Sequence, residues 1–250
     1  MSVKIIKKEE QASGSFTSGA ILENKPIGFP QDGGEQKPYS NLFYWANAWS
    51  DNGGLIGEHP HKMFEIVSFL IDGEVQHYDS KMNGWLSLKK GDAQIIRSGS
   101  GITHAERIMK GSRVFQVWFD PNIKESMHKE ASYDDYRSEE MKYYEENGIS
   151  YKDYMGNRGP LKMDSEGVLI SELSIPIGKH KIELDNSKIY SYYLLDGKAS
   201  IAEKGVVEND FIIVESEDGI EIEVSEDTRL FSITVPQQLT YKTYLELVNN

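Results

Sequence analysis

A chain of 250 residues can form one large domain or two smaller ones, and its net charge of −13 opposes direct binding to nucleic acid, because phosphate contacts depend on clustered Lys and Arg. The absence of cysteine excludes disulfides and thiolate chemistry, and we therefore expect a cytoplasmic protein. No stretch is apolar for long enough to cross a membrane, and the charged segment from Lys4 to Glu10 does not match a targeting signal.

The first 37 residues are polar and weakly periodic, apart from a short apolar step from Gly19 to Leu22. We expect this segment to be an irregular arm with one strand, laid across the other half of the protein. The segment from Asn41 to Trp49 is rich in aromatic side chains. We expect these rings to pack in a core or at the rim of a pocket.

Short apolar or alternating segments follow between Phe64 and Phe119, separated by turn signals such as Asp72-Gly73 and Asn83-Gly84. The segments are 64–71, 74–78, 85–88, 93–96 and 113–119. This pattern predicts a meander of short antiparallel strands, and such a meander curls into a sandwich or barrel.

Two pairs of ligand-type residues flank these strands, one in His59-Pro60-His61 and one in His104-Ala105-Glu106. In an extended strand, residues two apart point to the same face, with Cα atoms roughly 6.6 Å apart. Pro60 has no backbone N–H to donate and therefore suits a strand start or an edge. On neighbouring strands the two pairs would converge on one cation, so the sequence predicts a metal site. Its predicted ligands are His59, His61, His104 and Glu106.

Three imidazoles and one carboxylate suit Fe²⁺, Mn, Ni, Cu or Zn, and the affinity order does not choose among these metals. Glu65 is a rival for the carboxylate position. On a straight strand, however, it lies roughly 13 Å from His61, whereas Glu106 shares a strand face with His104. His77 falls outside both pairs, and we interpret it as a residue that supports a ligand or lies at the surface.

Together these residues resemble the pirins, metal-binding members of the cupin superfamily. The likeness is strongest in GEHPHKMFE (57–65), GEVQHYDS (73–80), GDAQ (91–94) and SGSGITHAE (98–106). It extends more weakly from Leu42 to Pro121. The resemblance implies a cupin-type barrel and favours Fe²⁺ as the metal.

The segment from Lys124 to Lys152 is rich in Glu, Lys, Asp and Tyr, and we interpret it as a solvated helical connector. Beyond it the chain repeats an earlier pattern, because YLLDG (193–197) echoes FLIDG (69–73) and NDFIIV (209–214) echoes GDAQII (91–96). The repeat predicts a second barrel. The positions equivalent to the four ligands carry Glu183, Asp185, Ile222 and Val224, so we expect no metal site there.

We therefore predict an all-β protein with two cupin-type barrels (double-stranded β-helix, or jelly-roll) in tandem. Residues 1–121 are expected to form the barrel with the metal site, and residues 122–160 a short helical connector. Residues 161–250 are expected to form a barrel without a metal site.

The resemblance implies two alternative functions. One is a metal-dependent dioxygenase of the quercetin 2,3-dioxygenase type, in which a flavonol-like aromatic substrate binds the metal through its 3-hydroxyl group and Glu106 accepts the proton. The other is a regulatory protein without turnover, like those pirins that act as transcription cofactors, in which the redox state of the metal alters a surface recognised by a protein partner. The sequence does not choose between them.

Overall fold

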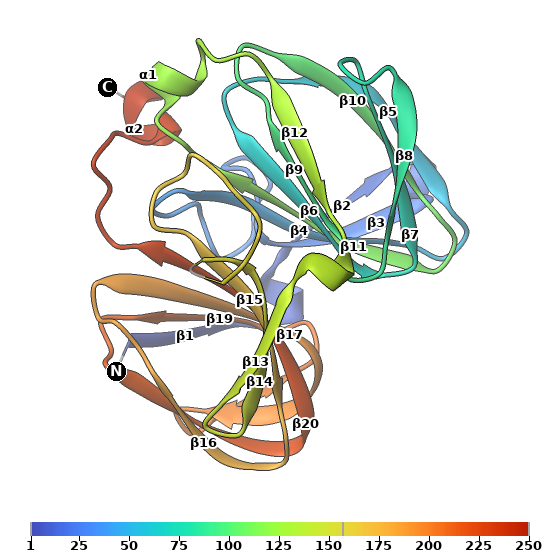
Figure 1. Ribbon diagram of the computed structural model, residues 1–250. Coiled ribbons are helices and arrows are strands. Elements are labelled where there is room, and N and C mark those ends of the chain that lie inside the picture. Colours follow the sequence, from blue (N-terminus) through green and yellow to red (C-terminus); the bar gives the residue numbers. More distant parts are fainter. Residues whose placement is uncertain (1, 157, 250) are drawn as a thin grey trace. The chain divides into compact units, whose positions relative to one another are not determined.

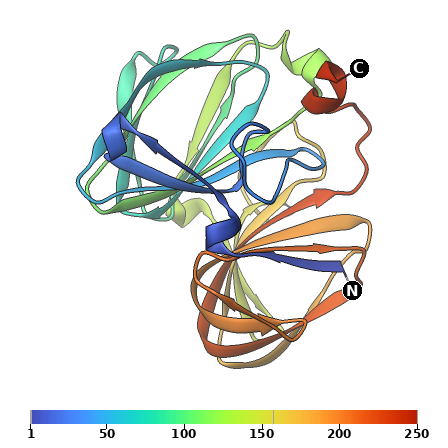
Figure 2. The same ribbon diagram turned by 180° about the vertical axis from the view of Figure 1, so that it is seen from behind.

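The structure, a computed structural model, describes residues 2–156 and 158–249 and consists mainly of antiparallel β-strands (Figures 1 and 2). The chain forms two compact units. The N-terminal unit comprises Gln11–Glu140, Met163–Ser165 and the segment from Leu239 onward. The C-terminal unit comprises the first ten residues, Met141–Lys162 and Glu166–Gln238. The predicted all-β fold is confirmed.

Two antiparallel sheets make up the N-terminal unit, one of seven strands in the order β12-β9-β6-β11-β4-β3-β2 and one of four in the order β5-β10-β7-β8. The strands are β2 (Ala12–Phe16), β3 (Ile21–Ile27), β4 (Leu42–Ser50), β5 (Gly54–His61), β6 (Glu65–Asp72), β7 (Glu74–Asp79), β8 (Gly84–Lys89), β9 (Ala93–Arg97), β10 (Ile102–Ile108), β11 (Ser112–Phe119) and β12 (Ser132–Tyr136). The helical turns are η2 (Thr17–Gly19), α1 (Ile123–Ser126), η3 (Ser138–Glu140) and α2 (Tyr244–Val248).

The strands between Phe64 and Phe119 that the sequence predicts are present, but their connections are not those of a meander. Strand β5 pairs with β10, and β6 lies between β9 and β11, so strands far apart in the sequence become neighbours. The reason is that consecutive strands such as β6 and β7 belong to different sheets and bury their apolar faces against each other. Gly73 joins them with a φ of +76°, and a Cβ atom there would lie 2.8 Å from the Cα of Ser112.

A single antiparallel sheet of nine strands makes up the C-terminal unit. Seven strands follow the order β1-β19-β17-β20-β15-β14-β13, while β16 pairs with β20 and β18 pairs with β17. The elements are β1 (Ser2–Ile6), η1 (Lys8–Glu10), β13 (Lys142–Glu146), β14 (Ile149–Met155), β15 (Leu169–Ile175), β16 (Gly178–Glu183), β17 (Lys188–Ile201), β18 (Lys204–Val207), β19 (Phe211–Glu215) and β20 (Gly219–Pro236).

The segment predicted as a helical connector is mainly β-strand, so that prediction is wrong. Its α-helix is only the four-residue α1; β12 then joins the N-terminal unit, and β13 and β14 join the C-terminal sheet. The charged strand β13 is held by its ladder to β14, in which the rings of Tyr144 and Tyr151 stack with centroids 4.9 Å apart. The units consequently do not divide at residues 121 and 161. The expected N-terminal arm is also divided, because β1 pairs with β19 while β2 and β3 belong to the N-terminal unit.

The C-terminal helix α2 covers an aromatic cluster of the N-terminal unit and lies beside α1 in both views (Figures 1 and 2). The Tyr244 ring contacts Phe43 and Phe64, with centroids 5.9 and 5.3 Å away. The backbone N–H of Tyr244 donates to the carboxyl group of Asp120. In the described part of the chain, no helix has the length and hydrophobicity that crossing a membrane requires.

The buried carboxyl group of Asp120 should make the stability of this unit depend on pH. The pKa of Asp120 is raised to about 7, mainly by burial, with a smaller contribution from Glu246, and the hydrogen bond from the Tyr244 N–H opposes the rise. Because the folded pKa lies above the unfolded value of 3.8, the associated stabilisation is complete below pH 3.8 and is lost as the pH rises through 7. We expect Asp120→Asn to raise the free energy of unfolding by about 1–3 kcal/mol at pH 8 and to change it little at pH 4.

The measurement is thermal unfolding across this pH range. Asp51→Asn is the control, because Asp51 is exposed in a loop. A lower melting temperature of Asp120→Asn at pH 8, or the same gain at both pH values, would contradict this role of Asp120.

Candidate metal centre

The pairing of β5 with β10 places two predicted ligands opposite each other. His59 faces His104 across the ladder, although 45 residues separate them in the sequence. The register shifts between His104 and Glu106, because Glu106 faces Ile56. This β-bulge adds a residue to β5 and turns its side chains, so that Ile56 and His59 both line the pocket although they are three residues apart.

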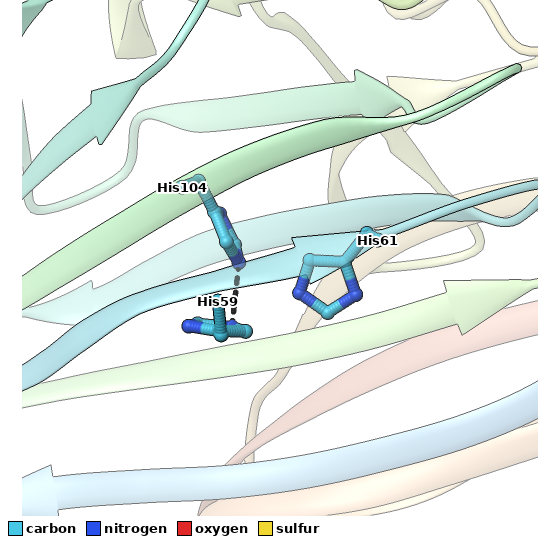
Figure 3. A group of neighbouring side chains, drawn as sticks. All are labelled: His59, His61 and His104. Atoms are coloured by element: carbon cyan, nitrogen blue, oxygen red, sulfur yellow. Dashed lines mark hydrogen bonds between the residues drawn. The ribbon is translucent and has the colours of Figure 1, made fainter.

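The rings of His59, His61 and His104 lie close together (Figure 3). Their centroids are 4.4–4.8 Å apart, and the Nε2 atoms of His59 and His104 are 2.9 Å apart. One ligand nitrogen from each ring lies within 4.8 Å of the others. The structure therefore brings the three predicted imidazoles together.

The bulge also orients the His59 ring, because it brings the carbonyl oxygen of Gly57 to 2.8 Å from Nδ1 of His59. Because a carbonyl oxygen can only accept a hydrogen bond, Nδ1 of His59 donates to it, and Nε2 of His59 lies within hydrogen-bond distance of Nε2 of His104. This is the arrangement in which a histidine ligand is held by its second nitrogen.

Burial keeps the other two imidazoles neutral. The pKa of His61 is lowered to about 3, mainly by burial, with smaller contributions from the neighbouring His104 and His59. Burial likewise lowers the pKa of His104 to about 2, with contributions from His59 and His77. Both rings therefore offer lone pairs at neutral pH. The Nε2 of His61 is buried and has no hydrogen-bond partner among the described residues, which fits a bound cation.

Glu106 belongs to a second, overlapping group. The ligand atoms of His77, His104 and Glu106 lie within 4.8 Å of one another, and all three side chains are buried. The two groups share His104 and together contain the four predicted ligands and His77, but among the described residues Glu106 does not fall in one group with His59 and His61. His77 is 1% exposed, which rules out the surface position left open by the sequence. The alternation Val75-His77-Asp79 on β7 was the signal for an inward His77.

Asp79 is a buried residue of the site that the sequence did not reveal. It is fully buried on β7, with its Oδ2 atom 3.4 Å from Nε2 of His77. Its Oδ1 atom accepts the backbone N–H groups of Lys81 and Met82. Asp79 therefore fixes the turn after β7 and supports the His77 ring from behind.

Glu106 is held by the opposite sheet. The side-chain amide of Gln116 donates to both carboxylate oxygens of Glu106, at 3.0 and 2.9 Å. Trp118 in turn donates its indole N–H to the amide oxygen of Gln116 at 3.2 Å, which sets the orientation of the amide. The Trp118 ring also packs edge-on against His61, with centroids 4.8 Å apart.

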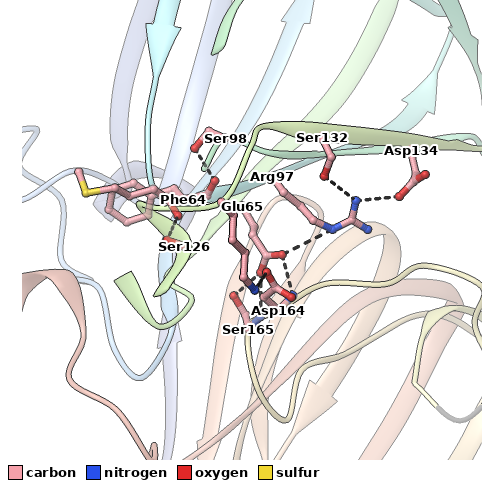
Figure 4. Close-up of polar contacts among 11 residues, drawn as sticks. Phe64, Glu65, Arg97, Ser98, Ser126, Ser132, Asp134, Asp164 and Ser165 are labelled. Carbon is pink, nitrogen blue, oxygen red and sulfur yellow. Dashed lines mark hydrogen bonds and ion pairs between the residues drawn. The ribbon is translucent and has the colours of Figure 1, made fainter. Parts of the chain in front are cut away.

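The rival carboxylate Glu65 has a different role (Figure 4). Its oxygens accept the backbone N–H groups of Asp164 and Ser165 and the hydroxyl group of Ser165, at 2.7–2.8 Å. The chain turns between β5 and β6, where Met63 has a φ of +73°, and Glu65 enters the seven-stranded sheet rather than the sheet of the histidines. Glu65 therefore anchors segment 163–165 within the N-terminal unit.

The described residues of the C-terminal unit contain no comparable group of ligand side chains. The pairing of β16 with β20 places His180, rather than the expected Glu183, opposite Ile222. The Nε2 atom of His180 lies 2.8 Å from the carbonyl oxygen of Pro176. An aliphatic side chain thus faces His180, whereas in the N-terminal unit His104 faces His59.

A pocket of about 350 Å³ opens beside the histidines between the two sheets of the N-terminal unit. The four-stranded sheet contributes Ile56, Gly57, His59, His61, Glu106 and Ile108. The seven-stranded sheet contributes Phe16, Glu23, Tyr44, Ala46, Ala48, Val114, Gln116 and Trp118. The lining is largely apolar with a few polar groups, as in sites for small organic ligands.

Part of the chain is similar in sequence to known proteins. Residues 37–119 match the pirin family. A quercetin 2,3-dioxygenase of Escherichia coli K12 is 35% identical over 68 residues, or 26% of this chain and 29% of that protein. A pirin-like protein of Caulobacter vibrioides is 23% identical over 193 residues, which cover 72% and 68% of the two chains. The matches to the first curated relatives span only 28–38% of the length of those proteins.

Solved structures extend the likeness to the whole fold. YhhW from Escherichia coli superposes with a TM-score of 0.78 at 19% identity, covering 96% of this chain and 100% of that chain. A quercetin 2,3-dioxygenase from Acinetobacter baumannii superposes with a TM-score of 0.78 at 18% identity, covering 99% and 86%. YhhW has also been solved in complex with nickel(II). These comparisons confirm the predicted resemblance and the bicupin fold.

Metal analysis of single variants tests the ligand set. We expect the purified protein, loaded with one divalent metal, to bind about one ion per chain. His104→Ala and His61→Ala should abolish binding, because each removes a buried imidazole lone pair. His77→Ala should retain the metal, although more weakly, since supporting residues typically contribute about 10–100-fold in affinity. His180→Ala is the matched control in the other unit. Full occupancy in His104→Ala, or loss in His180→Ala, would refute the site.

Proposed function

Because the chain carries a pirin domain within a bicupin fold, we propose that it is a metal-dependent dioxygenase that acts on a flavonol-like aromatic substrate. The observation that carries this proposal is that His59, His61 and Glu106 open onto one largely apolar pocket of about 350 Å³. Such a pocket accepts a flat aromatic molecule and leaves a polar oxygen of that molecule beside the ligand group.

The proposed metal ligands are His59, His61, His104 and Glu106, and the proposed metal is Fe²⁺. A metal bound there would act as a Lewis acid toward a phenolic oxygen and would couple the electron-rich substrate to dioxygen. The buried imidazoles of His61 and His104 fit this task, because their lowered pKa values let them bind a cation without first losing protons at neutral pH.

In this proposal Glu106 also accepts the proton of the substrate hydroxyl. The Gln116 amide occupies one acceptor position on each Glu106 oxygen, which leaves further lone pairs for the metal and for the hydroxyl. The amide and the indole of Trp118 keep the carboxylate in place while the proton moves. The apolar side chains of Ile56 and Val114 limit the access of water to the pocket.

Oxygen uptake with quercetin by the metal-loaded protein tests the proposal. We expect turnover with Fe²⁺ or with another of the candidate metals Mn, Ni, Cu and Zn. Glu106→Gln should lower turnover by about 10²–10⁴-fold, because a glutamine side chain cannot accept the proton in the same way. Glu58→Gln, on the exposed side of β5, is the matched control.

Two results would reject the proposed dioxygenase activity. One is the absence of turnover with every candidate metal, and the other is undiminished turnover in Glu106→Gln. A protein that binds metal, shows no turnover and binds a protein partner differently in its oxidised and reduced states would instead be a regulator.

A further inference from the structure

The pocket contains a second polar group on the wall opposite the metal ligands. Glu23 on β3 and Tyr44 on β4 belong to the seven-stranded sheet, and both line the pocket. They are 5% and 4% exposed. The Tyr44 hydroxyl donates to Oε2 of Glu23 at 3.3 Å, and Lys25 forms an ion pair with Oε1 at 2.9 Å.

This group can accept further hydrogen bonds but has little left to donate. The carboxylate of Glu23 has about four acceptor positions, of which Tyr44 and Lys25 use two. Tyr44 gives its proton to Glu23 and keeps its oxygen lone pairs. Burial, followed by the nearby Glu23, raises the pKa of Tyr44 well above its usual value, so the hydroxyl stays protonated. Lys25 also pairs with Asp32 at 2.9 Å, which leaves the group with excess negative charge.

The backbone of β2 makes room for this carboxylate. Gly14 lies opposite Glu23 in the ladder, and a Cβ atom at Gly14 would lie 2.2 Å from Oε1 of Glu23. Any side chain at position 14 would therefore push the end of the Glu23 side chain away. The hydrogen-bond partners therefore hold the carboxylate in place, and the lack of a side chain at Gly14 leaves room for it.

We propose that Glu23 and Tyr44 form a specificity-determining recognition point for a hydroxyl group on a substrate ring remote from the metal-binding oxygen. This inference rests on the proposed function and narrows its substrate class to aromatic compounds that bear hydroxyl groups at both ends. The negative excess disfavours a carboxylate at that end. A substrate without the remote hydroxyl is rejected because it buries these acceptors without supplying a donor.

Binding of two flavonols to the Zn²⁺-loaded protein tests this recognition point. Quercetin and galangin share the 3-, 5- and 7-hydroxyl groups, but galangin lacks the two hydroxyl groups of the pendant ring. We expect quercetin to bind about tenfold more tightly than galangin, measured as the ratio of dissociation constants from fluorescence titration. Tyr44→Phe and Glu23→Gln should each reduce the ratio to about twofold or less.

Two further variants complete the test. Gly14→Ala keeps every polar group but displaces the carboxylate, and it should also reduce the ratio. Tyr78→Phe is the matched control and should keep the full ratio, because the Tyr78 hydroxyl donates to Asn83 on an exposed turn. A ratio near one in the unaltered protein, a full ratio in both Tyr44→Phe and Glu23→Gln, or no binding of either flavonol would overturn the proposal.

The same flavonol pair separates this inference from the dioxygenase proposal. Equal turnover of quercetin and galangin would reject the proposed recognition point but would support the dioxygenase proposal. Selective binding of quercetin that depends on Tyr44 and Glu23, without turnover under any metal, would support the recognition point and reject the dioxygenase.

Discussion

The site depends on the ladder between β5 and β10, which joins strands that are distant in the sequence. The register places His59 opposite His104, and the bulge beside Glu106 turns β5 so that His59 faces inward. His61 and His104 are buried and His59 is partly buried, and the ladder holds their nitrogens near one another. Burying imidazole lone pairs is costly unless they find a partner, and a divalent cation is a partner that three convergent imidazoles fit well.

The two sheets of the N-terminal unit contribute different functions to the pocket. The four-stranded sheet carries the histidines and Glu106, and the seven-stranded sheet carries the groups that hold Glu106 or face a ligand. Gln116 connects the two sheets because its amide donates to Glu106 across the pocket. In the C-terminal unit the corresponding pair is His180 and Ile222, so the same strand arrangement does not gather ligands there.

The sequence predicted the strands between Phe64 and Phe119 and placed each pair of candidate ligands on one strand, because both are local patterns. The alternation of apolar residues and the turn at Gly73 mark the strands, and the spacing of His59 and His61 places both imidazoles near the end of one strand. The pairing of strands is not local. The sequence pattern therefore predicts a meander, whereas in the structure β5 pairs with the distant strand β10. Tertiary contacts also determine the secondary structure of the acidic segment around Tyr144. Its composition suggests a helix, but a ladder and a stacked ring stabilise a strand there.

Burial was the other property that the sequence did not reveal. His77 and Asp79 form a buried pair behind the ligands, and Glu23 lies on the inner face of a segment that was expected to be irregular. Glu65 could not be separated from Glu106 by spacing alone. The turn at Met63 separates them, since it moves Glu65 into the other sheet, where Ser165 binds it.

The most direct test of the central claim is a crystal structure of the metal-loaded protein with anomalous scattering data collected at the absorption edge of the metal. We expect one strong peak in the N-terminal unit, about 2.0–2.2 Å from a nitrogen of each of His59, His61 and His104 and from an oxygen of Glu106. A peak in the C-terminal unit, or one bound by His77 in place of His59 and His61, would contradict it.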